Sequence, residues 1–449
     1  MRLTVSLPAH RFAPLDWAVR TVLEEVLGLP IKVECTDRPD IILSAEGREI
    51  RLHSCFPDLD APREAWASQM PQIPLKVLER GNLPVLFGAP VITREETRTT
   101  CEVDIFGAIF FMLSRFEEVV LPDRDGHDRF PAAAALAGRE GFLQRPIVDE
   151  YAALLFSLMQ EHWPQMRRRV REGRTRISCD VDQPFDRVGR NPKALIRGLG
   201  GDLLRRKSPR TAARRALNFW THGSGDHRHD PFYTFDWYMD VCEQNGHRAA
   251  FYFIPDHSGG AIDGDYDISD LRILRLMQSI HARGHEIGMH GSFNTYQDPG
   301  QIRHERTRLT EALARAGLEV EILGNRQHYL RWDSAQTPDH LEACGFAYDT
   351  SGAFPDRPGF RYGTSQPFAM WSWTKRAPLK LRQHPLVLME CSVLSPGYLG
   401  MGHGREATDL MQSLKRAALR HGGDFTLLWH NSHLLTKADR ACFRSLVQT

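Results

Sequence analysis

The stretch ISCDVDQPFD, residues 177–186, decides the fold class. It contains the end of a short apolar segment and two aspartates, Asp180 and Asp182, that are separated by one residue. Because alternate residues of a strand point to the same face, a strand here places both carboxylates together at its end. Two carboxylates this close repel each other unless a cation or an arginine lies between them. Two solvated acids at a strand terminus are the alternative interpretation.

Strand-like and helix-like segments alternate after residue 175. Residues 232–246 (FYTFDWYMDVCEQNG) and 268–284 (ISDLRILRLMQSIHARG) have helical spacing, the second with Ser269 as N-cap and Gly284 as its stop. Residues 248–255 (RAAFYFIP) and 285–290 (HEIGMH) are short apolar strands. Such β-then-α units predict an α/β fold with a parallel sheet, open or closed into a barrel, with its chemistry at the C-terminal strand ends.

A second polar cluster follows the strand at 285–290. The sequence GHEIGMHGSFN, residues 284–294, carries His290 at the strand end and Asn294 shortly after it. A neutral imidazole and a carboxylate are common ligands for zinc and other divalent ions. A histidine in this place is more often only a hydrogen-bonded polar side chain, so the metal interpretation depends on Asp180 and Asp182 lying nearby.

These two motifs resemble those of the polysaccharide deacetylases, carbohydrate esterase family 4. CDVD is similar to the first family motif and GHEIGMHGSFN to the second. The resemblance implies that Asp180 is the catalytic base and that Asp182 and His290 bind a metal. Asn294 stands where the family has a second histidine ligand, and there the sequence departs from the pattern.

Three further motifs follow in the family's order. GNRQHYLRW (324–332) resembles the third motif, which implies that Arg326 lies against the base, and its Arg331 and Trp332 are candidates for substrate binding. YDTSGAFPDRPGF (348–360) is similar to the fourth motif, which implies that Asp349 lines the substrate groove. FTLLWHNSHL (425–434) is similar to the fifth motif, which implies that His430 is the general acid. The resemblance implies a distorted parallel (β/α) barrel of the polysaccharide-deacetylase type.

The resemblance also implies a divalent metal, zinc in the first place, with cobalt, manganese or nickel also possible. An amide oxygen is a weaker ligand for zinc than an imidazole. Three possibilities stay open: Asn294 binds the metal through its oxygen, another side chain such as His328, His285 or His257 takes its place, or the site holds little metal. A retained but weaker or different divalent metal is the favoured one.

The function implied is hydrolysis of an N-acyl group, most simply N-acetyl, on a bacterial polysaccharide or its amino-sugar precursor. A glycan-binding or scaffold protein that has lost turnover is one competing hypothesis, and Asn294 favours it. An amidohydrolase acting on small amides is another, because one fold can serve several substrates. The sugar, the acyl group and the oligomeric state cannot be read from the sequence.

The first part of the chain has a different pattern. Residues 1–170 mix short apolar runs with helix-like stretches, which predicts an α+β domain, and the charged segment 166–176 predicts the junction to a catalytic domain over 171–449. The stretches 104–118 (DIFGAIFFMLSRFEE) and 141–151 (GFLQRPIVDEY) resemble an accessory domain found before the barrel in a bacterial subgroup of these deacetylases. No chemistry is implied for it.

The composition limits the kinds of partner and location that we expect for the protein. The 449 residues carry a formal net charge of +1, with 42% apolar and 25% charged residues, so no overall field draws the protein to nucleic acid. There is no apolar window long enough for a spanning helix, and the N-terminus lacks a signal-peptide pattern, so we expect a cytoplasmic protein. The eight cysteines are scattered without a C-x-x-C pair, which favours free thiols.

Overall fold

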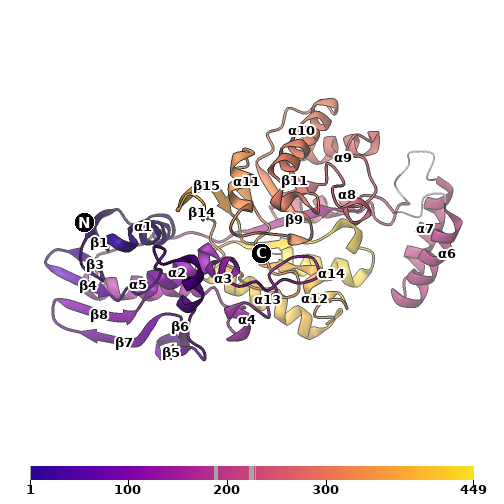
Figure 1. Cartoon of the computed structure of the whole chain (residues 1–449). Coiled ribbons are helices and arrows are strands. Elements are labelled where there is room, and N and C mark those ends of the chain that lie inside the picture. Colours follow the sequence, from indigo (N-terminus) through magenta and orange to yellow (C-terminus); the bar gives the residue numbers. More distant parts are fainter. Residues whose placement is uncertain (1, 187–190, 222–226, 228, 449) are drawn as a thin grey trace.

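A computed structural model describes residues 2–186, 191–221, 227 and 229–448. Two large sheets organise the chain (Figure 1). The first contains strands from residues 3–103, and the second begins with the strand at residue 175. The segment 163–174 between them lies outside helices and strands. The division of the chain into two domains near residue 170 remains a prediction.

The N-terminal sheet has six strands in the order β2-β1-β3-β4-β8-β7 and mixes parallel with antiparallel pairs. The strands are β1 (Leu3–Pro8), β2 (Ile31–Thr36), β3 (Ile41–Ala45), β4 (Arg48–Leu52), β7 (Gly88–Arg94) and β8 (Arg98–Val103), and a separate pair joins β5 (Lys76–Leu78) to β6 (Leu83–Val85). The helices of this part are α1 (Phe12–Arg20), α2 (Ile105–Ser114), α3 (Phe116–Val120), α4 (Leu136–Arg139) and α5 (Ile147–His162). This is the mixed α and β content that the sequence predicts.

The second sheet has nine strands in the order β14-β15-β13-β12-β11-β10-β9-β17-β16. They are β9 (Thr175–Val181), β10 (Ala249–Phe253), β11 (Glu286–Gly291), β12 (Gly324–Gln327), β13 (Tyr348–Asp349), β14 (Phe368–Ser372), β15 (Ala377–Gln383), β16 (Leu388–Met389) and β17 (Phe425–Leu428). All neighbours pair in parallel except β14 with β15. Within the described residues the pairing leaves β14 and β16 as edges, so the curled sheet is a half-barrel that does not close.

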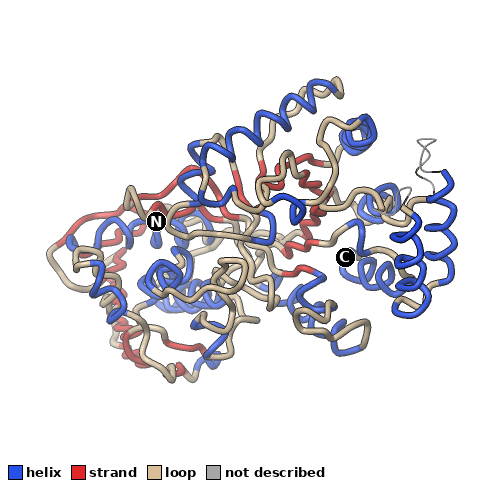
Figure 2. The backbone as a smooth tube through the Cα atoms, turned by 45° about the vertical axis from the view of Figure 1, so that its right-hand side comes forward, coloured by secondary structure: helices blue, strands red, loops and turns tan. Residues whose placement is uncertain are grey.

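Helices follow most of these strands and lie outside the curled sheet (Figure 2). They are α8 (Phe235–Gln244), α9 (Leu271–Ala282), α10 (Pro299–Arg315), α11 (Thr337–Ala343), α12 (Glu390–Leu394), α13 (Arg405–Arg420) and α14 (Lys437–Val447). The N-cap of α9 is Asp270, whose side chain accepts a hydrogen bond from the Arg272 N–H, and not Ser269. The N–H of Ser269 instead donates to Asp267. Gly284 ends the segment at φ +73°, as predicted.

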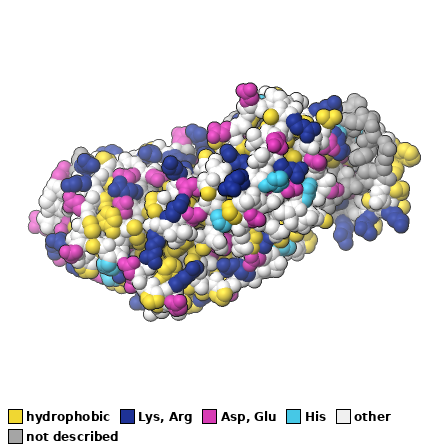
Figure 3. Space-filling view, turned by 45° about the horizontal axis from the view of Figure 1, so that its top comes forward, with side chains coloured by type: hydrophobic (Ala, Val, Ile, Leu, Met, Phe, Trp, Pro, Cys, Tyr) yellow, Lys and Arg dark blue, Asp and Glu magenta, His cyan; other side chains and the backbone are white. Residues whose placement is uncertain are grey.

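A helical hairpin projects from the barrel at the far right of Figure 1. It consists of α6 (Pro192–Gly200), the helical turn Gly201–Arg205 and α7 (Pro209–Thr221), and it lies between β9 and α8 in the sequence. Leu204 and Trp220 on it are more than four-fifths exposed. Elsewhere on the face shown in Figure 3, basic and acidic side chains alternate, in keeping with the balanced charge. None of the helices in the described residues has the length and apolar content to cross a membrane.

A buried ion network joins the two parts of the chain. Glu118, which follows a break in the helix at Arg115 (φ +54°), accepts hydrogen bonds from Arg115 Nε at 2.8 Å and from Arg361 Nη2 at 2.7 Å. Ser334 donates to the same carboxylate at 2.6 Å. Glu118 and both arginines are at most 3% exposed. Although burial alone would raise it, the pKa of Glu118 falls to about 2, because Arg361 and Arg115 stabilise its charge.

Removing this carboxylate is expected to destabilise the whole chain. Glu118→Gln leaves the buried Arg361 without its carboxylate partner and leaves Arg115 with Glu117 alone, so the free energy of unfolding should fall by about 3–5 kcal/mol. Urea denaturation followed by circular dichroism measures the change. The matched control is Glu161→Gln, because Glu161 pairs with Arg80 and Arg94 at the surface and should contribute about 0–1 kcal/mol. Equal effects of the two substitutions would contradict the prediction.

Candidate active site

A cavity of about 220 Å³ opens at the C-terminal ends of the barrel strands. Its carboxylate, imidazole and thiol side chains lie at or just after the ends of five strands: Asp180 and Asp182 at β9, His290 at β11, His328 after β12, Cys391 after β16, and His430 and His433 after β17. A larger cavity, of about 880 Å³, lies at the opposite ends of the same strands. Among the described residues, the two clusters of potential metal ligands both lie at the smaller one, so we take it as the candidate site.

Three side chains in this cavity converge as metal ligands do. Asp182, His290 and His328 each offer one ligand atom, and these atoms lie within 4.8 Å of one another. Nε2 of His290 lies 3.3 Å from Oδ1 of Asp182, and Nε2 of His328 lies 3.7 Å from Oδ2. Two ligand atoms at ~2.1 Å from a tetrahedral ion are roughly 3.4 Å apart. The spacing therefore fits one divalent cation among the three side chains.

In both His290 and His328 the ring nitrogen Nδ1, which does not face Asp182, is hydrogen-bonded. Nδ1 of His290 lies 2.8 Å from the carbonyl oxygen of Arg326, and Nδ1 of His328 lies 2.7 Å from Oδ1 of the fully buried Asp263. An oxygen at Nδ1 places the proton there and leaves Nε2 free to bind a metal, the arrangement usual for histidine ligands. Burial would raise the pKa of Asp182, but His328 and His290 lower it well below its ordinary value and keep the carboxylate charged.

Asp180 lies beside the predicted arginine. Its Oδ2 is 3.6 Å from Nη1 of Arg326 and 3.6 Å from Nε2 of His290. Its Oδ1 is buried and accepts no hydrogen bond from the protein. Arg326 is fully buried, and its Nη2 donates to the hydroxyl of Ser178 at 3.0 Å. The structure thus brings Asp180, Asp182, His290 and Arg326 together.

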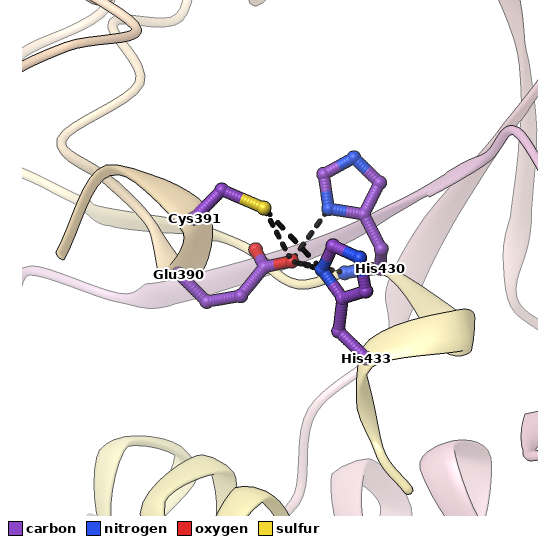
Figure 4. A group of neighbouring side chains, drawn as sticks. All are labelled: Glu390, Cys391, His430 and His433. Carbon is purple, nitrogen blue, oxygen red and sulfur yellow. Dashed lines mark hydrogen bonds and ion pairs between the residues drawn. The ribbon is translucent and has the colours of Figure 1, made fainter. Parts of the chain in front are cut away.

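His430 reaches the same cavity from the other side. Its Nε2 lies 3.5 Å from Oδ2 of Asp182, and its Nδ1 lies 2.6 Å from Oε1 of Glu390 (Figure 4). Burial would lower the pKa of His430, but the Glu390 carboxylate raises it well above its ordinary value. The sequence did not single out Glu390, although it follows the apolar run PLVLM in the way that Asp182 follows β9.

Two more side chains of the wall were not predicted. Sγ of Cys391 lies 3.3 Å from Nδ1 of His433, which in turn lies 2.7 Å from Oε1 of Glu390 (Figure 4). Burial and Glu390 both raise the pKa of the Cys391 thiol, but hydrogen bonds from His430 and His433 outweigh them and lower it. All eight cysteines are free, as predicted.

Asn294 lies outside this cluster. Its side-chain amide donates to the carbonyl of Ser258 at 2.8 Å and accepts from Nη1 of Arg331 at 3.1 Å. It is exposed, and it does not line the cavity. His328 instead stands beside Asp182 and His290. Two more histidines that the sequence allows as ligands, His285 and His257, do not line the cavity either, and His285 is hydrogen-bonded to Glu243.

The three predicted substrate-binding residues are buried away from the cavity. Asp349 is fully buried and accepts hydrogen bonds from Asn325, Gln383 and Ser351. Trp332 is 3% exposed and packs in the main core. Arg331 lies between the rings of Phe293 and Tyr296, with its guanidinium 4.0 Å and 4.1 Å from their centres. None of the three side chains therefore lines the candidate site, and their role in substrate binding stays a prediction.

The N-terminal part of the chain braces the turn that carries His328. Tyr329 and Leu330 both have left-handed backbone, at φ +60° and +55°, which is strained for such residues. Nη1 of Arg129 donates to the carbonyl of Tyr329 at 3.0 Å, and Arg331 donates to the carbonyl of His127 at 2.8 Å. Arg129 also lines the cavity. The N-terminal part therefore contributes directly to the site.

Three solved structures are similar to the chain at low identity. A protein assigned to the polysaccharide deacetylases, from Mycobacterium smegmatis, is 18% identical, with 62% of this chain and 83% of that chain covered and a TM-score of 0.39. One from Pseudomonas aeruginosa PAO1, assigned likewise, is 12% identical over 70% and 90%, with a TM-score of 0.36. The Puue allantoinase is 15% identical over 48% and 67%, with a TM-score of 0.33. No curated protein matches the sequence.

One family model matches the chain. Residues 3–164, which hold β1–β8 and α1–α5, match a family of unknown function (DUF7033). The match ends before β9, so it covers less than half of the chain. Of the side chains that line the candidate site, Arg129 alone lies within it.

Proposed function

We propose that the protein is a metal-dependent hydrolase that removes an N-acyl group, most simply N-acetyl, from an amino sugar of a polysaccharide or its precursor. The observation that carries the proposal is the arrangement of Asp180 and His430 on either side of the Asp182, His290 and His328 cluster. A base, a protonated imidazole and a set of metal ligands around one small cavity are the groups that amide hydrolysis requires.

Asp182, His290 and His328 would hold the cation, with His328 in place of Asn294. Their donor set of one carboxylate and two imidazoles suits zinc, and cobalt, manganese or nickel also accept it. The hydrogen bonds from their outer atoms to Asp263 and to the Arg326 carbonyl fix the rings. A bound divalent cation supplies Lewis acidity for the acyl oxygen and the attacking water.

The remaining residues handle the protons. Asp180, oriented by Arg326, takes a proton from the water that attacks the acyl carbon. His430, protonated because it faces Glu390, gives its Nε2 proton to the departing nitrogen as the C–N bond breaks. Glu390 keeps the imidazole oriented through Nδ1. Each proton thus moves at an atom that faces the cavity.

The substrate class rests on the motif resemblance and on the size of the cavity. Ligand cavities usually have about 300–1,000 Å³, so 220 Å³ suits one acylamino group with part of its sugar ring better than a whole oligosaccharide. Tyr329 and Tyr398 line the cavity and offer aromatic surface to a sugar ring. A small-amide substrate is the second candidate, and the size of the cavity favours it.

The test is release of acetate from N-acetylglucosamine oligomers and from simple acetamides, with and without chelator. We expect release that stops with chelator and returns with zinc or cobalt. Faster turnover of acetamides than of oligomers would assign the small-amide function. Oligosaccharide binding without acetate release, unaffected by chelator, would instead show a binding protein that has lost turnover.

Arg129 offers a test of how the N-terminal part supports the site. Arg129→Gln removes the hydrogen bond to the Tyr329 carbonyl and should let the His328 turn relax, which lowers metal affinity about 10–100-fold, as loss of an outer partner does. Competition with a chromogenic chelator measures the affinity. Arg124→Gln is the control, because Arg124 lies in the same segment and donates to its own neighbours, Leu121 and Asp123. Unchanged affinity in Arg129→Gln would contradict the brace.

A further inference from the structure

A second group of potential ligands lies in the wall of the cavity. Glu390, Cys391, His430 and His433 offer atoms that all lie within 4.8 Å of one another (Figure 4). Glu390 and Cys391 begin α12 directly after β16, and the two histidines follow β17. Because β16 and β17 are hydrogen-bonded neighbours, the backbone holds both pairs in fixed positions. The catalytic steps proposed above use His430 and Glu390 but not Cys391 or His433.

We propose that Glu390, Cys391 and His433 form a second cation site, selective for a thiophilic divalent ion such as Zn²⁺. A thiolate, an imidazole and a carboxylate are all zinc ligands, and the thiolate favours zinc over magnesium, calcium or manganese. Sγ of Cys391 and Nδ1 of His433 are 3.3 Å apart, close to the separation of two ligands on one tetrahedral ion. His433 is 45% exposed at its side chain, so an ion can enter from solvent.

The hydrogen bonds around Glu390 point to the same conclusion. Oε1 of Glu390 faces Nδ1 of His430 at 2.6 Å, Nδ1 of His433 at 2.7 Å and the Cys391 thiol at 3.5 Å. Oε2 is buried and has no hydrogen-bond partner. Oε1 therefore faces three groups that can each carry a proton, while Oε2 has no hydrogen-bond partner. A cation bound by Sγ of Cys391, Nδ1 of His433 and a carboxylate oxygen of Glu390 would replace the hydrogen bonds among these three side chains.

Occupation of this site acts on the first one through His430. That imidazole presents Nδ1 to Glu390 and Nε2 to Asp182, at 3.5 Å from Oδ2. A cation that binds Glu390 takes up the carboxylate oxygen that lies 2.6 Å from Nδ1 of His430, so the imidazole loses the contact that orients its Nε2 toward Asp182. This consequence, which rests on the proposed function, is inhibition: Zn²⁺ beyond one equivalent should slow amide hydrolysis about 100-fold or more, the usual contribution of a general acid.

Cobalt reports on the second site directly, because a thiolate bound to Co²⁺ gives a charge-transfer band in the near ultraviolet. The full-length protein is stripped with chelator, kept reduced with a phosphine and titrated with Co²⁺. We expect two equivalents to bind and the band to accompany one of them. Cys391→Ser should bind one equivalent of Co²⁺ and show no band. His433→Asn, a change at a half-exposed residue, should weaken the band as well.

Controls separate this site from the first. Cys442→Ser should keep the band, because Cys442 is also partly buried but belongs to neither ligand cluster. Asp182→Asn should no longer bind the Co²⁺ equivalent that gives no band. It should still bind the equivalent that gives the band. A wild-type protein without the band, or a band that survives in Cys391→Ser, overturns the second site. If the wild-type protein does not hydrolyse the amide but binds two equivalents of Co²⁺ and shows the band, the result counts against the proposed function and not against this site.

Discussion

Replacing Asp180 by asparagine should lower amide hydrolysis at least about 1,000-fold while the protein stays folded and keeps its metal. The carboxylate lies 3.6 Å from both Arg326 and His290, and its Oδ1 is free of protein partners, so it is placed to take a proton from water. General bases contribute ~10²–10⁴-fold to such reactions. Asparagine has the same shape and cannot take the proton, so kcat should fall with little change in KM.

His430→Asn separates the roles of base and acid. An amide must gain a proton as its nitrogen leaves, whereas the phenolate of an aryl acetate leaves without one. Both variants should therefore fail on an amide, but His430→Asn should retain much of its activity on an aryl acetate and Asp180→Asn should not. Initial rates on the two substrates, with metal content measured for each variant, decide the matter. Equal loss on both substrates in both variants would contradict the assignment of His430 as the acid.

Much of the barrel could be predicted from the sequence because its elements are locally encoded. The strands β9, β10 and β11 are short apolar runs, and each stops at a polar residue or proline. The helices after them have clear stops, such as Gly284 at φ +73°. The parallel sheet then follows from the order of the elements, and it brings Asp180, Asp182, His290, Arg326 and His430 to one edge. These are the site residues that the motifs indicate and the structure gathers.

The rest of the site depends on where side chains point, which the order of the motifs does not show. Asp349 ends a strand as Asp180 does, yet its carboxylate faces into the structure and is held by Asn325, Gln383 and Ser351. Glu390 sits after a strand of two residues, too short to be recognised by alternation. The bracing by Arg129 joins segments 200 residues apart, and no local pattern reports it.

His328 and Asn294 illustrate the same limit of prediction from motif order, at the candidate metal site. The motif alignment puts Asn294 in the ligand position, but two left-handed residues after His328 turn that imidazole into the cavity. Its Nε2 faces Asp182, and Asp263 holds its other nitrogen. We propose that in this chain a histidine from the third motif takes the place of the one that the second motif lacks.

His328→Asn should therefore cost metal affinity at least about 100-fold, more than loss of an outer partner. Asn294→Ala should leave it within about threefold, because the Asn294 amide is tied to Ser258 and Arg331. Chelator competition with zinc and cobalt measures both, in a Cys391→Ser background so that one site is titrated.

The decisive variant places a histidine at position 294 in the protein that lacks His328. Asn294→His combined with His328→Asn keeps the number of histidines constant and changes only the backbone position that carries the imidazole. Since position 294 is exposed and does not line the cavity, the double variant should bind metal as weakly as His328→Asn alone. Affinity regained to near the wild-type value would show that position 294 reaches the metal, and would return the ligand role to the residue that the motif alignment chose.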